Sequence, residues 1–166
     1  MIFVTVGSDR YPFDRLLRAV EDAYVRHQLT DEIIFQYGSC LHAPSIGRTE
    51  AFIPFREVRS LVGRATIVVT HAGVGSIGLC LTRSMRPIVL PRQSSLGEAV
   101  DDHQISYAEH MEKEGYIWCA RSVAELQNYV VEAANGRRSL SVVSYREERK
   151  RLCDFLAQHV SRDPIA

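Results

Sequence analysis

A glycine-bearing turn after an apolar run is the segment with the clearest chemical potential. Thr66–Thr70 reads as a buried strand, and residues 71–76 (HAGVGS) turn directly into a predicted helix. The first amides of a helix lack partners within it, and with the helix dipole they favour an anion. Glycine lets a phosphate approach the backbone, although it also permits a turn that is simply close-packed. The residues that would form this phosphate site are His71, Gly73, Val74, Gly75 and Ser76.

Other predicted strand ends carry residues that should converge on the same place. Gly7-Ser8 follows the first apolar run, Phe52-Ile53-Pro54-Phe55 surrounds the end of the third, and Arg92 follows the fifth. One of the two phenylalanines can be core packing, because neighbours on a strand point to opposite faces. A guanidinium such as that of Arg92 pairs well with a ligand carboxylate. We favour the alternative, an arginine that lies at the surface or touches a partner protein.

A second polar cluster, Asp101-Asp102-His103-Gln104, opens a later predicted helix. Aspartates at this position cap a helix and complement its dipole, and Asp101 is the predicted N-cap. In the alternative interpretation, His103 and Gln104 face the crevice and offer hydrogen bonds to a sugar or a phosphate. Adjacent aspartates without D-x-D spacing do not predict a metal site.

The elements that must position these residues alternate between short apolar runs and amphipathic stretches. Ser122 with Glu125 predicts a capping box, and Asn135-Gly136 a helix end. This alternation predicts one α/β domain with a mostly parallel sheet, and such sheets bind ligands at the carboxyl ends of their strands. The predicted strands are 2–6, 32–37, 51–53, 66–70, 87–90 and 116–119, and the predicted helices are 12–27, 56–63, 73–84, 101–114, 122–135 and 144–160.

Composition narrows the class of protein. Twenty basic and 20 acidic residues give a net charge of zero, so nothing favours nucleic acid as a partner. Cys80 and Cys119 lie in apolar runs and are interpreted as buried thiols of a reducing compartment. We expect no signal peptide and no membrane span. Neither G-K-[ST] nor G-x-G-x-x-G follows a strand, and the second strand ends in Gln36 without an acid to hold a ribose.

Several of these motifs, in this order, resemble the donor-binding C-terminal domain of glycosyltransferase family 28, in particular PssE-like subunits of exopolysaccharide synthesis. The resemblance covers about residues 1–135 and implies that residues 1–166 form a single Rossmann-like domain equivalent to the C-terminal, donor half of a GT-B enzyme. The matching segments are 1–7 with 12–16, 52–55, 70–76, 86–92 and 100–104.

The resemblance also implies an activity. It is transfer of a hexose from a UDP-sugar, with glucuronate or N-acetylglucosamine as the sugars considered, to a lipid-linked acceptor in bacterial polysaccharide synthesis. UDP-sugar is then a substrate, and neither a cofactor nor a metal is expected. The implied partner is a PssD-like, membrane-anchored, acceptor-binding subunit, which would hold the chain at the cytoplasmic face of the membrane. The alternative is a non-catalytic nucleotide-binding or scaffold subunit of the same fold.

Site roles follow from the resemblance position by position. Gly7 and Ser8 would lie at the diphosphate edge, residues 52–55 would frame uracil, and the 71–76 turn would cradle the diphosphate. His103 and Gln104 would lie near the sugar hydroxyls. Relatives carry a ribose-binding glutamate seven residues before the proline of the fifth strand, where this chain has Cys80. No residue is a convincing general base, and we expect the partner to supply one.

Overall fold

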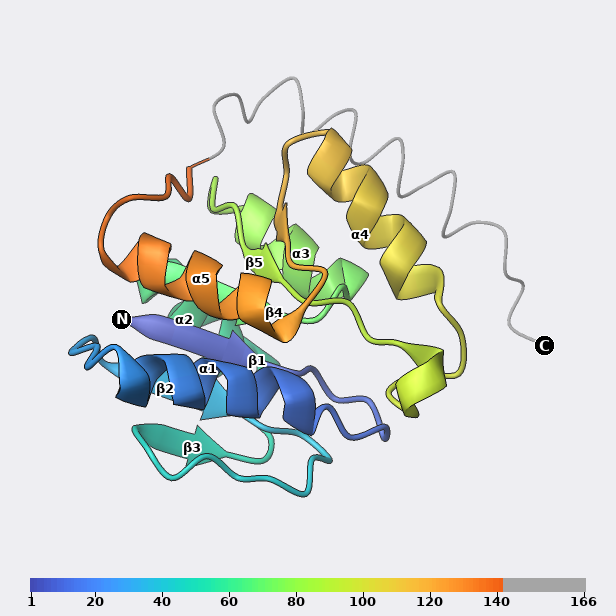
Figure 1. The fold of residues 1–166 in the computed structure, drawn as a ribbon, viewed down its shortest axis with the longest axis horizontal. Coiled ribbons are helices and arrows are strands. Elements are labelled where there is room, and N and C mark those ends of the chain that lie inside the picture. The colour runs from blue at the N-terminus through green and yellow to red at the C-terminus, as the bar shows by residue number, and fades with distance from the viewer. Residues whose placement is uncertain (142–166) are drawn as a thin grey trace.

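The protein is a parallel α/β domain in the computed structural model, which describes residues 1–141. The predicted helix at 144–160 and Cys153 therefore lie outside the described residues. Six strands pair in the order β3-β2-β1-β4-β5-β6, and every pairing between them is parallel (Figure 1). The strands are β1 Ile2–Thr5, β2 Ile33–Gln36, β3 Arg48–Glu50, β4 Ile67–Thr70, β5 Ile88–Val89 and β6 Trp118–Cys119.

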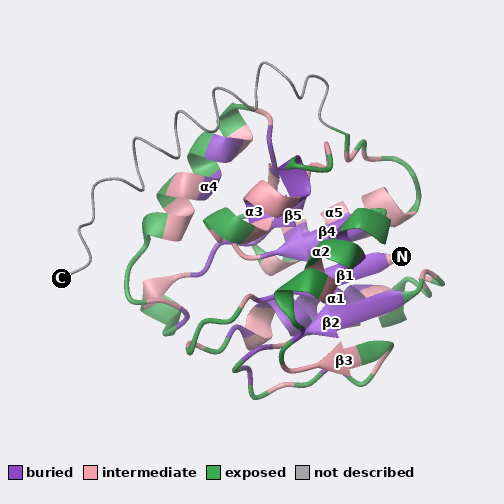
Figure 2. Ribbon diagram, turned by 180° about the vertical axis from the view of Figure 1, so that it is seen from behind, coloured by how far each residue is buried: buried purple, intermediate pink, exposed green. Residues whose placement is uncertain are grey.

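The helices cover both faces of this sheet. α1 and α5 pack on each other over one face, and α2 and α3 lie over the other, with α4 beside β6 (Figures 1 and 2). Successive residues of β1 point to opposite faces of the sheet. Ile2 and Val4 pack in the core under α1 and α5, and Phe3 packs in the core under α2. The helices are α1 Asp14–Arg26, α2 Phe55–Arg64, α3 Val74–Leu81, α4 His103–Lys113 and α5 Val123–Ala134, with a 3₁₀ turn at Ser94–Leu96.

The strand order decides where the site lies. The chain fills the sheet outward from β1 in one direction through β2 and β3, then returns to the other side of β1 with β4. The connections therefore diverge between β1 and β4, where an open parallel sheet leaves a crevice at its carboxyl edge. Residues immediately after Thr5 and Thr70 border that crevice, because these two residues are opposite each other in the sheet.

The predicted capping residues at the two ends of α5 are confirmed. Ser122 Oγ accepts from the Glu125 amide at 3.1 Å, and the Glu125 carboxylate accepts from the Arg121 amide at 2.8 Å. Asn135 closes the helix, and Gly136 follows with a φ of +67°, which glycine adopts without strain. These short-range bonds involve residues close in sequence, which explains why the pattern alone located them.

The third strand and the start of α4 differ from prediction. β3 is Arg48–Glu50, not 51–53, because an edge strand is partly exposed and needs no apolar run; Arg48 instead pairs with Glu50 and with Glu57. α4 begins at His103 rather than at Asp101. The N-cap residue is Asp102, but its carboxylate accepts from the Ser94 amide at 2.8 Å and so binds the preceding loop rather than capping the helix.

The cysteines agree with the sequence analysis. Cys80 and Cys119 are buried free thiols, and so is Cys40. Burial raises the pKa of Cys80 to about 12 and that of Cys119 to about 11, so both stay protonated at neutral pH. Within residues 1–141, no helix has the length and apolarity needed to cross a bilayer.

Candidate functional site

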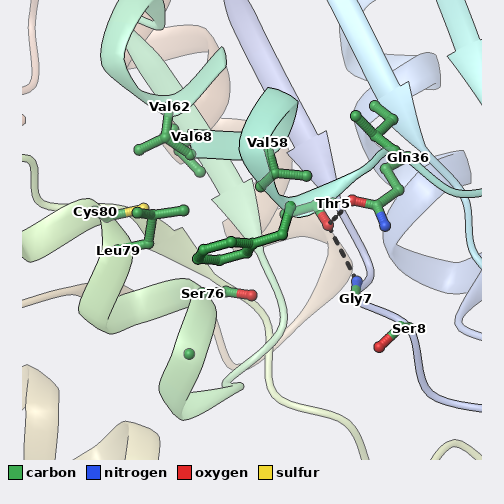
Figure 3. A pocket seen from close by; sticks show the side chains of 13 residues that line it. Thr5, Gly7, Ser8, Gln36, Val58, Val62, Val68, Ser76, Leu79 and Cys80 are labelled. Carbon is green, nitrogen blue, oxygen red and sulfur yellow. Dashed lines mark hydrogen bonds between the residues drawn. The ribbon is translucent and has the colours of Figure 1, made fainter. Parts of the chain in front are cut away.

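A cavity of about 270 Å³ opens at the carboxyl ends of β1 and β4, between α2 and α3 (Figure 3). The ends of β1 and β2 form its floor, and the two helices form its walls. This is the crevice that the strand order predicts. Its lining residues are Thr5, Gly7, Ser8, Gln36, Ile53, Phe55, Val58, Val62, Val68, Gly75, Ser76, Leu79 and Cys80.

The lining is polar on one side and apolar on the other. Gly7 and Ser8 lie in the loop after β1 and Ser76 lies in the first turn of α3, whereas Val58 comes from α2 and Leu79 from further along α3 (Figure 3). A nucleotide presents the same division, with a charged diphosphate at one end and a flat, largely apolar base at the other. This division of the lining makes a nucleotide a candidate ligand of the cavity.

The 52–55 segment borders the apolar side. Phe52 and Phe55 are 56% and 74% exposed, so core packing explains neither of them. Ile53 is the buried member of the segment, and Pro54 is the exposed N-cap residue of α2. Ile53 and Phe55 line the cavity, but Phe52 and Pro54 do not. An exposed aromatic ring at the rim of a cavity is available to pack on a planar ligand.

The glycine turn ends β4 and begins α3, as predicted. Gly73 is the N-cap residue in an extended conformation without a side-chain cap, and the Ile77 amide donates to its carbonyl at 3.0 Å. The amides of residues 74–76 come before Ile77 in the chain and have no acceptor within the helix, as is general for the first residues of a helix. Val74 is 41% exposed, and Gly75 and Ser76 line the cavity. These amides and the helix dipole make this helix start a candidate anion site.

His71 explains two of the glycines. A Cβ at Gly7 would lie 2.6 Å from His71 Cε1, and a Cβ at Gly73 would lie 2.2 Å from Nε2. The imidazole is therefore packed between the two loops, and neither position accepts a side chain. Gly75 differs, because a Cβ there would meet nothing within 4 Å. Packing requires Gly7 and Gly73, whereas Gly75 is open on its cavity side.

The surroundings of His71 keep it neutral. Burial is the main cause, followed by the nearby Arg92 charge, and together they lower its pKa to about 4. Asp9 and a backbone hydrogen bond to Thr5 act in the opposite direction. Nδ1 lies 3.2 Å from Thr70 Oγ1. At neutral pH His71 is thus uncharged, and it is not among the residues that line the cavity.

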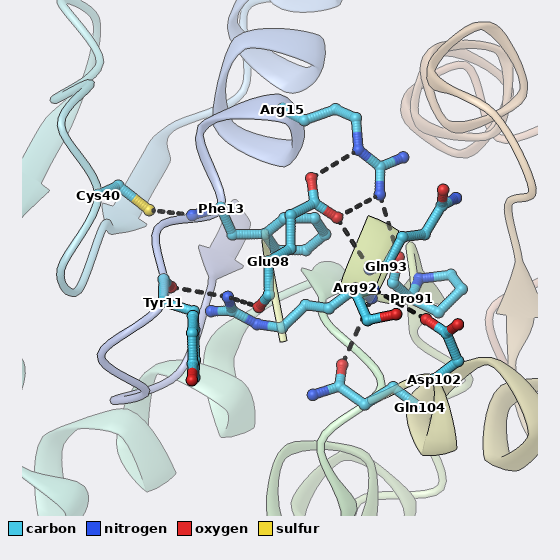
Figure 4. Close-up of polar contacts among 11 residues, drawn as sticks. Tyr11, Phe13, Arg15, Cys40, Pro91, Arg92, Gln93, Glu98, Asp102 and Gln104 are labelled. Atoms are coloured by element: carbon cyan, nitrogen blue, oxygen red, sulfur yellow. Dashed lines mark hydrogen bonds and ion pairs between the residues drawn. The ribbon is translucent and has the colours of Figure 1, made fainter. Parts of the chain in front are cut away.

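Arg92 is not at the surface, which corrects that prediction. Its side chain is fully buried, and its terminal nitrogens donate to the carbonyls of Val6, Tyr11 and Glu98 at 2.7–2.8 Å (Figure 4). Arg15 holds the Glu98 carboxylate through two bonds of 2.8 Å. The Arg92 guanidinium therefore joins the loop after β1 to the loop after β5, and its bonds go to backbone rather than to a ligand carboxylate.

His103 and Gln104 are not among the residues that line the cavity. The His103 side chain is 90% exposed and lies 2.8 Å from Asp101, and Gln104 Oε1 accepts from the Arg92 amide at 3.5 Å. Both stand at the start of α4, so their predicted contacts with the sugar stay a prediction. Among residues 1–141, no group of three or more His, Cys, Asp or Glu side chains is arranged to hold a metal ion.

The sequence analysis did not name the apolar lining residues Val58, Val62, Val68 and Leu79 as site residues, and it missed two polar ones, Thr5 and Gln36. Both are buried, at 4% and 6% exposure, and they are the last residues of β1 and β2. The available signal was a polar side chain at the final position of an otherwise apolar strand. Cys80, in place of the expected glutamate, is 1% exposed and forms part of the apolar wall.

The strand order and the cavity at the point where the connections diverge define a Rossmann-like domain of the kind that forms the C-terminal half of GT-B glycosyltransferases. The model of the glycosyltransferase family 28 C-terminal domain matches residues 1–156. The chain belongs to this family.

Similar proteins align with this chain over only part of their own length. The UDP-N-acetylglucosamine transferase subunit ALG13 of two strains of Cryptococcus neoformans var. neoformans serotype D is 39% identical over 77 residues, which are 45% of this chain and 36% of that subunit. Among solved structures, the glycotransferase of kitacinnamycin aligns with a TM-score of 0.58 at 19% identity, over 96% of this chain and 39% of its own. The calicheamicin glycosyltransferase CalG4 aligns with a TM-score of 0.54 at 16% identity, over 96% and 38%. These structures support the fold.

Proposed function

We propose that this chain binds the UDP-sugar donor of a two-component, metal-independent hexosyltransferase that acts on a lipid-linked acceptor in bacterial polysaccharide synthesis. The diphosphate would contact the amides of residues 74–76 and the loop at Gly7 and Ser8. The uracil would lie on the apolar side, against Phe55. The observation that carries this proposal is the cavity that joins an anion-binding helix start to an apolar slot.

The leaving group would be stabilised by amides and the helix dipole, without a cofactor. As the sugar departs, negative charge develops on the diphosphate, and donors fixed in place interact with it without reorganising. The neutral imidazole of His71 would act through packing, because it sets the spacing of the loops that carry Gly7 and Gly73. Arg92 would act indirectly, because it holds the loop that carries Gly7 and Ser8.

The acceptor and its general base would come from a second, PssD-like, membrane-anchored protein, which would keep this chain at the inner face of the membrane. Two observations support that division. No described residue that lines the cavity titrates near neutral pH, since its one ionisable group, the Cys80 thiol, has a pKa of about 12. The ALG13 relatives are named as subunits of a transferase.

A matched pair of glycine substitutions tests the anion site. Gly75 lines the cavity and Gly78, in the same helix, does not, and a Cβ at either position meets nothing within 4 Å. Gly75→Ala should lower the affinity for UDP roughly tenfold or more, because the methyl group fills space that the diphosphate needs. Gly78→Ala should leave the affinity unchanged. Both variants should fold with equal or higher stability, since alanine is the better helix former.

The measurement is titration calorimetry with UDP, UDP-glucuronate, UDP-N-acetylglucosamine and GDP, together with a thermal unfolding scan. Equal affinities of Gly75→Ala and Gly78→Ala for UDP would place the diphosphate elsewhere. Absence of any uridine nucleotide binding by the wild-type chain would refute the proposed function.

A further inference from the structure

The floor of the cavity carries two polar side chains, Thr5 at the end of β1 and Gln36 at the end of β2, which are opposite each other in the sheet. Only five polar or charged residues are buried in the described part of the chain, and these are two of them; the others are Thr70, Arg92 and Glu98. Burial of polar groups costs free energy, so the presence of two of them at one cavity needs an explanation.

Hydrogen bonds fix the orientation of the Gln36 carboxamide. The Gly7 amide donates to Thr5 Oγ1 at 3.1 Å, and Thr5 Oγ1 lies 3.1 Å from Gln36 Oε1. Because the threonine oxygen already accepts one bond, its own hydrogen is free to go to Gln36 Oε1, which leaves the NH₂ group on the other side. No residue among 1–141 accepts a hydrogen bond from that NH₂ group in the structure.

The NH₂ group of Gln36 is not sealed inside the protein. Gln36 lines the cavity. Within residues 1–141, Arg92 Nε is the single side-chain nitrogen or oxygen that is sealed from solvent and lacks a hydrogen-bond partner, so Gln36 Nε2 is not sealed in this way. Figure 3 shows the carboxamide beside Thr5 and above Gly7 and Ser8. The NH₂ group is therefore a hydrogen-bond donor in a fixed orientation that has no acceptor among the described residues. It is available to an acceptor of a ligand in the cavity.

Its position along the cavity indicates which part of a nucleotide it would meet. Gly7 and Ser8 mark the diphosphate side and Val58 and Leu79 the base side, and a nucleoside diphosphate places its ribose between the two. The end of the second strand is also where dinucleotide-binding sheets of this strand order place a ribose contact. Cys80 cannot serve this purpose well, because a thiol is a weak hydrogen-bonding group.

We propose that Gln36 is a ribose-recognition residue, whose Nε2 donates a hydrogen bond to a ribose hydroxyl oxygen of the donor nucleotide. This inference rests on the proposed function. Thr5 is then a positioning residue, since it orients the carboxamide and also holds the Gly7 amide at the diphosphate side. The Thr5 hydroxyl would thus connect the ribose contact of Gln36 with the backbone of Gly7 at the diphosphate.

A cycle of protein and ligand changes tests the contact. UDP, 2′-deoxy-UDP and 3′-deoxy-UDP are titrated by calorimetry into the wild-type chain and into Gln36→Met, which keeps length and volume without the amide. In the wild type, loss of the contacted hydroxyl should lower affinity roughly tenfold. Gln36→Met should bind UDP roughly tenfold more weakly than the wild type does. Removal of either ribose hydroxyl should not lower its affinity further, because the carboxamide that contacts the hydroxyl is already absent.

Thr5→Ser is the conservative control, because it retains the hydroxyl and should retain the wild-type preference for ribose. A second measurement needs no variant: the side-chain ¹⁵N–¹H resonances of Gln36 in the wild-type chain should shift on addition of UDP, and less so with the deoxy analogue that binds more weakly.

The outcomes separate the two proposals. If the wild type binds no uridine nucleotide, both fail. If it binds UDP but Gln36→Met binds equally well, or loses the same factor for UDP and both deoxy analogues, or the Gln36 resonances respond identically to all three ligands, the ribose contact alone is overturned.

Discussion

His71 illustrates how a single side chain sets both the packing and the charge of the site. Its ring lies against the backbone of Gly7 and Gly73, so it determines the spacing of the segments that follow β1 and β4. The same burial depresses its pKa to about 4. A histidine next to a candidate phosphate site suggests a cation from sequence alone, but here the desolvation of the ring favours the neutral form.

The depressed pKa of His71 predicts a pH dependence of stability. Between its folded value of about 4 and the ordinary value of 6.5, the unfolded chain binds more protons than the folded one. The contribution of His71 to the free energy of unfolding is thus complete above pH 6.5 and is lost as the pH falls toward 4, with a slope of up to ~1.4 kcal/mol per pH unit. Urea unfolding across this range should show a shallower slope for His71→Asn. Identical slopes in variant and wild type would contradict the assignment.

At the scale of elements, the loop after β1 and the loop after β5 form one unit. Arg92 donates to carbonyls of both loops, and its guanidinium lies 4.8 Å from the centre of the Phe13 ring. Arg15 reaches from α1 to the Glu98 carboxylate and to the Pro91 carbonyl. These contacts hold the backbone of the diphosphate side, so the site depends on residues that do not line it.

Removal of the Arg92 guanidinium should therefore be costly. Arg92→Met leaves three buried carbonyls without donors, at about 1–3 kcal/mol each, so we expect a loss of roughly 3–5 kcal/mol in the free energy of unfolding. Denaturant titration measures it, and Arg56→Met, at an exposed arginine of α2, is the matched control with almost no expected change. A loss below about 1 kcal/mol for Arg92→Met would show that water replaces the guanidinium, and that the two loops are not held by it.

At the scale of the whole molecule, the cavity in the described part of the chain has one ionisable group in its lining, the Cys80 thiol. The match with the ALG13 relatives spans about a third of their length. The proposed function therefore assigns the acceptor side to a second protein.

This division predicts the behaviour of the purified chain. It should bind UDP-sugars yet release almost no UDP when a lipid-linked acceptor is added, because no described residue that lines the cavity is suited to deprotonate that acceptor. Addition of the membrane-anchored partner should raise turnover by at least about a hundredfold, the usual contribution of a general base. A coupled assay of UDP release measures this, and robust turnover by the chain alone would refute the division of labour.

Much of the fold was predictable from sequence because it depends on local patterns. Buried parallel strands are short continuous apolar runs, and helix ends follow from residues a few positions apart, as Ser122 and Glu125 illustrate. The glycine turn after β4 was predictable for the same reason. β3 was misplaced, because an exposed edge strand held by ion pairs has no apolar signal.

The α/β class, the family resemblance and the residues at the strand ends could all be inferred from the amino-acid sequence. Which of those residues share the cavity could not, since that depends on the folded chain. In the structure, Arg92 is buried among carbonyls, His103 is exposed to solvent, and Thr5 and Gln36 line the cavity. A side chain's hydrogen-bond partners and its desolvation depend on residues 30 to 90 positions away, as the Arg92 bond to Val6 shows, and no local pattern records such distances.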